Sequence, residues 1–169
     1  MPSSTKIAVA SGVCKEINMK VLIVFLVGVA FALAGPHHEH GHEGHYVVKS
    51  HDDLVSYRNA CAEKVHASED LVEKYKKWQY PDDAVTHCYL ACVFEKFGFY
   101  DAEHGFDVHK VHMQLAGPSA HVDHSDEMHQ KIAQCAESHK EGDSCAKAYH
   151  AGMCFMNANL RLVQHSVQV

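Results

Sequence analysis

Apolar residues recur every three or four positions in six stretches of the chain, a spacing that places them on one face of an α-helix. The first stretch begins near Ser50 and the second covers residues 68–78. The others are residues 82–96, residues 107–116, a segment from Ser125 toward Gly142, and residues 144–164. The pattern therefore predicts about six helices.

Residues typical of helix ends support these boundaries. Ser50 and Asp53 form an S-x-x-D pattern that resembles a capping box, and Ser68 and Ser125 are suited to cap the second and fifth helices. Gly98 closes the third helix and Gly117-Pro118 closes the fourth. No segment alternates convincingly between apolar and polar residues with period two, so the predicted fold class is all-α.

The stretch CYLACVFEKF, residues 88–97, is the predicted central element. Cys88 and Cys92 lie four residues apart and share one face of a helix, while Leu90, Phe94 and Phe97 form a second apolar row. Because both sides need burial, this helix belongs inside the domain. The connection that follows, FGFYDAEHGFD, contains four aromatic residues, so we expect it to pack against the domain.

The beginning of the chain reads as a targeting segment. Lys20 precedes the apolar run 21–33, and Ala32-Leu33-Ala34 supplies an A-x-A cleavage signature. The run is about half of the roughly 20 apolar residues that span a bilayer. We expect a secreted, extracellular protein divided into an upstream extension (1–18), a signal peptide (19–34), a flexible histidine-rich tail (35–49) and a helical domain (50–169).

Charge restricts the classes of partner. Residues 1–34 carry a net charge of +2, so the formal −6 of the whole chain leaves −8 for residues 35–169. An acidic domain with few arginines is a poor candidate for binding nucleic acid or anionic membranes. We expect no nucleic-acid partner.

The histidine-rich tail is the strongest sequence signal for metal. Clustered imidazoles bind zinc, copper or nickel, and the tail offers weak candidate ligands at His37, His38, His40, His42 and His45. A flexible soluble tail is the alternative interpretation. A copper site at the free amino terminus is excluded because Pro36 would occupy the second position after cleavage at Ala34.

Six cysteines follow residue 34, and an even number in a short secreted chain indicates a disulfide framework. Six cysteines allow 15 pairings. Cys88 and Cys92 point the same way from one helix. Each is therefore better placed to form a disulfide with a different neighbouring segment than to bond the other. The spacing lacks the C-x2-C pairs of a structural zinc site, and secretion favours oxidation.

The spacing Cys61-x26-Cys88-x3-Cys92-x42-Cys135-x9-Cys145-x8-Cys154 resembles that of the insect odorant-binding and pheromone-binding proteins. The resemblance covers residues 50–164, including CYLACVFEKFGFYD and GMCFMNANL. It implies three interlocked disulfides, Cys61–Cys92, Cys88–Cys145 and Cys135–Cys154, around an internal hydrophobic cavity.

The resemblance implies a soluble carrier of a small hydrophobic ligand, such as an odorant, a pheromone or a lipid, with no cofactor. Apolar positions on the predicted inner faces supply the expected wall: Leu90, Phe94, Phe97, Phe106, Val111, Leu115, Met128, Ile132, Tyr149, Met153, Met156 and Leu160. Tyr149, Tyr89 or His112 could anchor a polar group of the ligand. The candidate protein partner is a membrane chemoreceptor, and we expect a monomer or a weak homodimer.

Histidine titrates near pH 6.5, and relatives in this family are associated with pH-dependent release. The candidate switches are His87, His112, His129 and His150. The terminal sequence LRLVQHSVQV could either fold back as a lid or fray.

Two other functional classes are alternatives to a carrier. A secreted metal-binding or scavenger protein would use the histidine-rich tail. An enzyme is disfavoured because G-x-S-x-G, H-E-x-x-H and similar motifs are absent from the sequence. His104 with Asp101, Glu103 and Asp107 could form an acid-base or metal cluster, but they occupy a turn-rich loop, where charged side chains are normally solvated. We predict a protein without catalytic residues.

Overall fold

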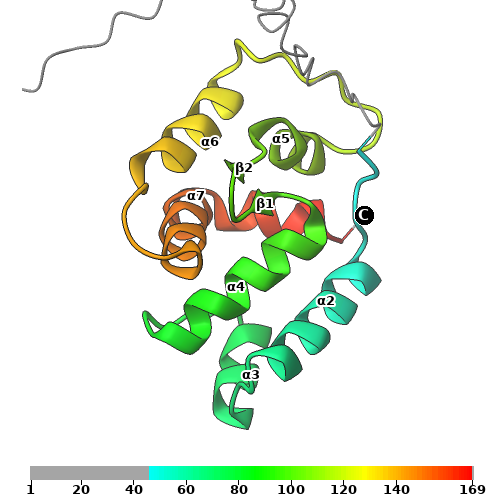
Figure 1. Cartoon of the computed structure of the whole chain (residues 1–169). Coiled ribbons are helices and arrows are strands. Elements are labelled where there is room, and N and C mark those ends of the chain that lie inside the picture. The colour runs from blue at the N-terminus through cyan, green and yellow to red at the C-terminus, as the bar shows by residue number, and fades with distance from the viewer. Residues whose placement is uncertain (1–45, 169) are drawn as a thin grey trace, which may run out of the picture. The chain divides into compact units, whose positions relative to one another are not determined.

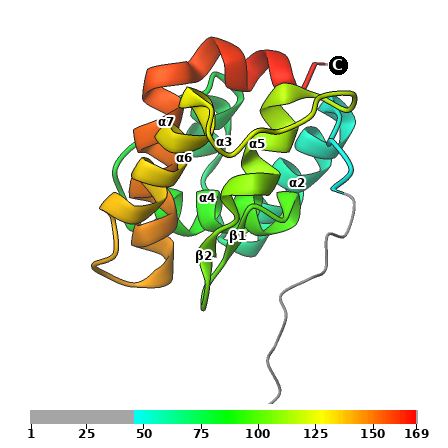
Figure 2. The same cartoon turned by 90° about the horizontal axis from the view of Figure 1, so that it is seen from above.

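A computed structural model describes residues 46–168 of the chain. Within this range it contains six α-helices and one two-stranded hairpin (Figures 1 and 2). Their bounds are α2 (His51–Lys64), α3 (Glu69–Lys76), α4 (Ala84–Phe97), β1 (Tyr100–Asp101), β2 (Gly105–Phe106), α5 (Val108–Ala116), α6 (Glu127–Ser138) and α7 (Ser144–Ser166). The predicted all-α class with about six helices is confirmed.

Side-chain oxygens cap the start of every described helix. The predicted capping box is present at α2, where Ser50 and Asp53 bond each other's backbone, and Ser68 caps α3. Aspartates cap the remaining four helices. The prediction that Ser125 caps α6 is wrong, because Asp126 accepts the bond from the His129 amide at 2.8 Å. Ser125 instead bonds Asp123.

The aromatic connection after α4 forms a hairpin. Gly98 ends α4 with φ of 77°, a conformation that glycine adopts without steric cost. Tyr100 pairs with Phe106 and Asp101 with Gly105 across the two antiparallel strands. Strands of two residues are too short to show a period of two, so the apolar pattern could not predict them. The expected packing is confirmed, since Tyr100 is buried and its hydroxyl donates to the Ser144 carbonyl at 2.8 Å.

Helix α4 lies between α2 and α7 (Figure 1). Its buried side includes Tyr89, Leu90, Val93 and Phe97. Toward α7, Phe94 of the same apolar row lies against Gly152, so close that a methyl group at Gly152 would come within 2.4 Å of that ring, while Ala91 and Cys92 are buried as well. The predicted central element is therefore packed on both faces.

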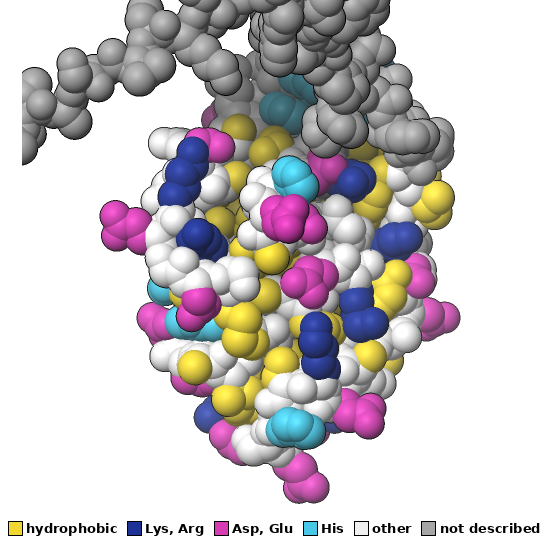
Figure 3. All heavy atoms as spheres, in the orientation of Figure 1, with side chains coloured by type: hydrophobic (Ala, Val, Ile, Leu, Met, Phe, Trp, Pro, Cys, Tyr) yellow, Lys and Arg dark blue, Asp and Glu magenta, His cyan; other side chains and the backbone are white. Residues whose placement is uncertain are grey.

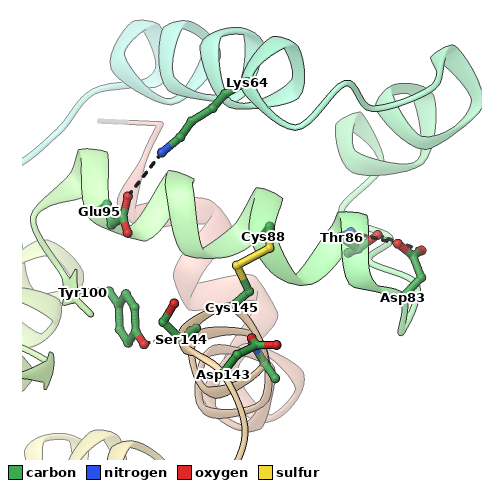
Figure 4. Close-up of a disulfide and its surroundings, with 10 residues drawn as sticks. Lys64, Asp83, Thr86, Cys88, Glu95, Tyr100, Asp143, Ser144 and Cys145 are labelled. Carbon is green, nitrogen blue, oxygen red and sulfur yellow. Dashed lines mark hydrogen bonds and ion pairs between the residues drawn. A yellow bond between two sulfur atoms is a disulfide. The ribbon is translucent and has the colours of Figure 1, made fainter. Parts of the chain in front are cut away.

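Three disulfides join four of the helices. Cys61–Cys92 links α2 to α4, Cys88–Cys145 links α4 to α7, and Cys135–Cys154 links α6 to α7, with Cα separations of 5.7, 4.5 and 5.7 Å. These are the pairs that the family resemblance implies. Figure 4 shows the side chain of Cys88 reaching from α4 to Cys145 at the start of α7.

Helix α7 changes direction at Asn159, which has non-helical φ and ψ of −134° and 29°. The break rotates the following residues, so Leu160 is 38% exposed and the prediction that it belongs to the inward stripe is wrong. The helix continues to Ser166, and Ser166 and Val167 are buried. The end of the chain is thus packed rather than frayed through Val167.

Residues 46–49 belong to the packed domain. Tyr46 is 9% exposed, and its hydroxyl donates to Gln114 Oε1 at 2.8 Å. The predicted tail boundary at residue 49 is therefore too late, because a single buried tyrosine anchors this segment. The five candidate metal-binding histidines of the tail lie outside the described residues.

The surface carries acidic and basic side chains intermixed on the face seen in Figure 3. Ion pairs such as Lys74–Asp70 and Lys131–Glu127 lie along single exposed helices. Within residues 46–168, no helix combines the length and the apolar character needed to cross a bilayer.

Candidate functional site

A cavity of about 90 Å³ lies among the helices. It is lined mainly by apolar side chains from α2, α4, the hairpin, α5, α6 and α7. One water needs roughly 10–15 Å³ on this measure, so the space can hold a small organic molecule. The cavity is the concave apolar feature to which binding is most naturally assigned.

Eight of the twelve predicted wall residues line this cavity: Leu90, Phe94, Phe97, Phe106, Val111, Leu115, Ile132 and Met156. The other four, Met128, Tyr149, Met153 and Leu160, do not. Tyr149 instead stacks on His87 and donates its hydroxyl to the Tyr80 carbonyl, while Met128 and Met153 pack among neighbouring apolar side chains. Whether a predicted residue reaches the cavity depends on the rotation and offset of its helix, and sequence spacing determines neither.

The sequence interpretation missed part of the wall. Val93, Phe155, Val163 and Val167 line the cavity in addition to the predicted positions. Phe155 and Val163 lie on α7 next to predicted wall residues, so a wider apolar face on that helix would have included them. Val167 enters the wall only because the chain bends at Asn159.

Part of the cavity wall is polar and includes Arg58 and Tyr80. The Arg58 guanidinium donates to the Tyr80 hydroxyl at 2.8 Å and lies over the Trp78 ring, 4.3 Å from its centroid. Tyr89 also lines the cavity, and its ring stacks on Tyr75 with centroids 3.9 Å apart. Of the three predicted anchors, only Tyr89 lines the cavity, since His112 and Tyr149 lie outside its wall.

Both cavity tyrosines are neutral donors at physiological pH. Burial raises the pKa of Tyr89 far above its ordinary value of 10.0. Burial likewise raises the pKa of Tyr80, although the charge and hydrogen bond of Arg58 act in the opposite direction. Because Tyr80 accepts its bond from Arg58, its hydroxyl can still donate one hydrogen bond of its own.

Gln114 of α5 also lines the cavity. Its Oε1 accepts from the Tyr46 hydroxyl and the Lys49 amide, both at 2.8 Å. Its Nε2 donates to the carbonyls of Lys49 and Ser166 at 2.9 and 2.8 Å. One buried side chain therefore joins the beginning of the domain, α5 and the end of α7. The sequence interpretation did not select Gln114.

Four histidines gather where α5 meets the start of α6. His109 Nδ1 lies 3.0 Å from His124 Nε2, and His112 Nδ1 lies 3.3 Å from His129 Nδ1. His112 Nε2 also lies 3.2 Å from Asp126 Oδ2. Burial, followed by the charges of His124, His112 and His109, lowers the pKa of His129, and Asp126 opposes this shift. The structure thus brings together two predicted switches, His112 and His129, with two that were missed.

Two residues of the possible cluster in the hairpin loop, Asp101 and His104, come together in the structure. Asp101 Oδ1 accepts from the backbone amides of Glu103 and His104 and lies 2.8 Å from His104 Nδ1. These bonds, that of the His104 side chain first, lower the pKa of Asp101. Asp107 caps α5 instead, and pairs with Lys110. The loop is an exposed turn.

Comparison with known proteins identifies the family. The family model described as PBP/GOBP matches residues 44–158. The chain belongs to the insect odorant-binding (PBP/GOBP) family. It is 75% identical over 152 residues to general odorant-binding protein 99b of Drosophila melanogaster, covering 89% of this chain and 100% of that protein.

More distant members of the odorant-binding family agree. Odorant-binding protein 22 of Aedes aegypti is 31% identical over 150 residues, which cover 89% of this chain and 99% of that protein. A crystal structure of Anopheles gambiae odorant-binding protein 22a with bound odorant cyclohexanone is 27% identical, with a TM-score of 0.54, covering 65% of this chain and 93% of that one. Proteins of this family are carriers rather than enzymes and are typically secreted.

Proposed function

We propose that this odorant-binding protein is a secreted carrier that holds a small, mostly apolar ligand with one hydrogen-bond acceptor. The observation that carries the proposal is the apolar cavity whose wall includes Tyr80 beside Arg58. Each 100 Å² of apolar ligand surface removed from water stabilises the complex by about 2.5 kcal/mol. The related complex with cyclohexanone, a ring with one carbonyl, supports this ligand class.

The tyrosine hydroxyls supply selectivity in this proposal. A ligand carbonyl oxygen placed near Tyr80 accepts a hydrogen bond from its hydroxyl. Arg58 donates to the same hydroxyl oxygen and so polarises it. Tyr89 offers a second hydroxyl on the same wall. A hydrocarbon of the same shape gains burial but no hydrogen bond.

The test is displacement of a fluorescent apolar probe from the secreted chain by cyclohexanone and by cyclohexane. We expect the ketone to bind more tightly, and Tyr80→Phe to weaken ketone binding about fivefold, the value of one hydrogen bond of about 1 kcal/mol. Binding of cyclohexane should not change. Tyr57→Phe, which alters a tyrosine outside the cavity wall, is the matched control. Absence of probe binding together with stoichiometric metal uptake by the histidine-rich tail would overturn the carrier proposal.

Release at acidic pH is a further part of the proposal. His109 and His112 on α5 face His124 and His129, and each close nitrogen pair needs at least one unprotonated ring. Protonation of both rings in a pair creates repulsion that Asp126 only partly offsets. Since α5 and α6 carry the wall residues Val111, Leu115 and Ile132, their separation opens the cavity. Ligand affinity measured at neutral and acidic pH tests this.

A metal-binding or scavenger protein is the second candidate function, favoured by five histidines within residues 37–45. Zinc or copper uptake that disappears when these histidines are replaced would support it. A membrane chemoreceptor as the partner of the loaded carrier, and a monomeric or weakly dimeric state, remain predictions from the sequence.

A further inference from the structure

A second group of side chains, away from the cavity, has the composition of a metal site. Asp82 precedes α4, His87 lies in its first turns, and His150 lies on α7. One potential ligand atom from each of these residues lies within 4.8 Å of the other two. His87 Nε2 is already 2.6 Å from Asp82 Oδ1.

The surroundings hold these groups in place. The His87 ring stacks on Tyr149 with centroids 4.2 Å apart, and its side chain is only 16% exposed. The His150 ring lies 5.3 Å from that of His87. The Cys88–Cys145 disulfide joins the same two helices next to His87, so the distance between the two imidazoles is restrained covalently. Ligands fixed in this way lose little freedom when they bind a metal.

The donor set selects the class of ion. Two imidazoles and one carboxylate suit zinc and its first-row neighbours, whereas calcium and magnesium prefer oxygen ligands alone. Bonds of about 2.0–2.2 Å in a tetrahedral site place neighbouring ligand atoms roughly 3.4 Å apart. The exposed Asp82 carboxylate therefore needs to retreat by about 1 Å or less from His87. Three protein ligands leave a fourth coordination position open.

We propose that Asp82, His87 and His150 form a binding site for a divalent transition metal of the zinc class. The metal joins the start of α4 to the middle of α7, and it replaces the proton that His87 and Asp82 share in the hydrogen bond. His139, whose ring centroid is 5.6 Å from that of His150, lies at the edge of the site. This site is separate from the histidine-rich tail and does not depend on the carrier function.

The experiment is calorimetric titration of Zn²⁺ into the secreted chain in which all five tail histidines are replaced by serine. We expect one Zn²⁺ per chain, and a tetrahedral absorption spectrum when Co²⁺ is used as the probe. His150→Ala should weaken binding at least tenfold. Asp82→Asn should weaken it as well, and because Asp82 is exposed, this substitution should leave the fold intact. His165→Ala, an exposed histidine on the same helix, is the matched control and should bind normally.

Two outcomes overturn the proposal. One is Zn²⁺ binding that is unchanged in both His150→Ala and Asp82→Asn. The other is binding that persists in these variants but is lost in His129→Ala, which would place the metal at the histidines between α5 and α6. Circular dichroism of each variant establishes that a loss of binding is not a loss of fold.

Discussion

Gln114 is buried on α5, with 2% of its surface exposed, and both atoms of its amide are used in hydrogen bonds. The four bonds hold the backbone of Lys49, the Tyr46 hydroxyl and the Ser166 carbonyl. A buried polar group that is hydrogen-bonded adds little net stability. If it is removed, however, its buried partners lose their hydrogen bonds, and this lowers the free energy of unfolding. Its removal therefore affects three segments of the chain together.

Gln114→Leu keeps the approximate size of the side chain and removes all four bonds. Each buried group left without a partner costs about 1–3 kcal/mol, and partial access of water reduces the sum, so we expect a loss of about 2–4 kcal/mol in the free energy of unfolding. Urea denaturation measures this loss. Gln134→Leu, an exposed substitution of the same kind on α6, should change stability little. Equal effects of the two substitutions would contradict the assigned role of Gln114.

Residue types alone could not reveal this role. Gln114 follows Val111 by three positions and so lies on the inward side of α5, which is the only sequence signal for its burial. Its partners come from residues 46–49 and from the end of α7, more than 50 positions away in either direction. Tyr89, in contrast, was found because it belongs to the central cysteine stretch.

At the scale of elements, helix positions followed from the sequence and their detailed contacts did not. Apolar periods and capping residues located all six described helices. The hairpin was missed because its strands have only two residues each, and the break at Asn159 was missed because no glycine or proline marks it. Four predicted wall residues fell outside the cavity because a rotation of α6 or α7 by part of a turn decides which side chains reach it.

The contact between α5 and α6 predicts a pH dependence. Burial lowers the pKa of His129 below the ordinary histidine value of 6.5, so the folded state resists a proton that the unfolded state accepts. Stability from this group is present above pH 6.5 and is lost as the pH falls from there through the lowered pKa. We expect ligand affinity and thermal stability to fall together over this range.

The double substitution His109→Ala with His124→Ala tests this assignment at two exposed positions. It removes two positive charges that His129 meets in acid, so the acid-induced loss of affinity should become smaller. A magnetic resonance titration should show a higher pKa for His129 in the variant. His51→Ala, on the exposed start of α2, is the control. An unchanged acid transition in the variant would assign the pH dependence to other groups.

At the scale of the whole molecule, the disulfides connect α2 to α4, α4 to α7 and α7 to α6. Helix-helix packing and these bonds reinforce one another, because α4 and α7 share both the apolar core and a covalent link. A domain held in this way can keep an unfilled apolar cavity. Without the disulfides, the helices of a chain of this size would pack closer together and fill that space.

Removal of one disulfide at a time should follow the lengths of the closed loops. The sequence separations are 57 for Cys88–Cys145, 31 for Cys61–Cys92 and 19 for Cys135–Cys154. Loop entropy predicts losses of about 4.2, 3.7 and 3.2 kcal/mol respectively when both cysteines become serine. Guanidinium denaturation gives the order. A loss for Cys135–Cys154 that exceeds the other two would show that native packing, rather than loop entropy, decides the effect.

Helix α5 contains no cysteine, yet it lies in a segment, residues 93–134, whose ends are fixed. Cys92 holds one end to α2 and Cys135 holds the other to α7. In the proposed acid release, α5 moves away from the cavity but stays tethered at both ends, so its return is a first-order event within a confined volume. A released ligand diffuses away with no such confinement. The proposed opening of α5 therefore sets two rates in competition, the return of the tethered helix and the escape of the free ligand. Their ratio determines how long the proposed carrier retains its ligand.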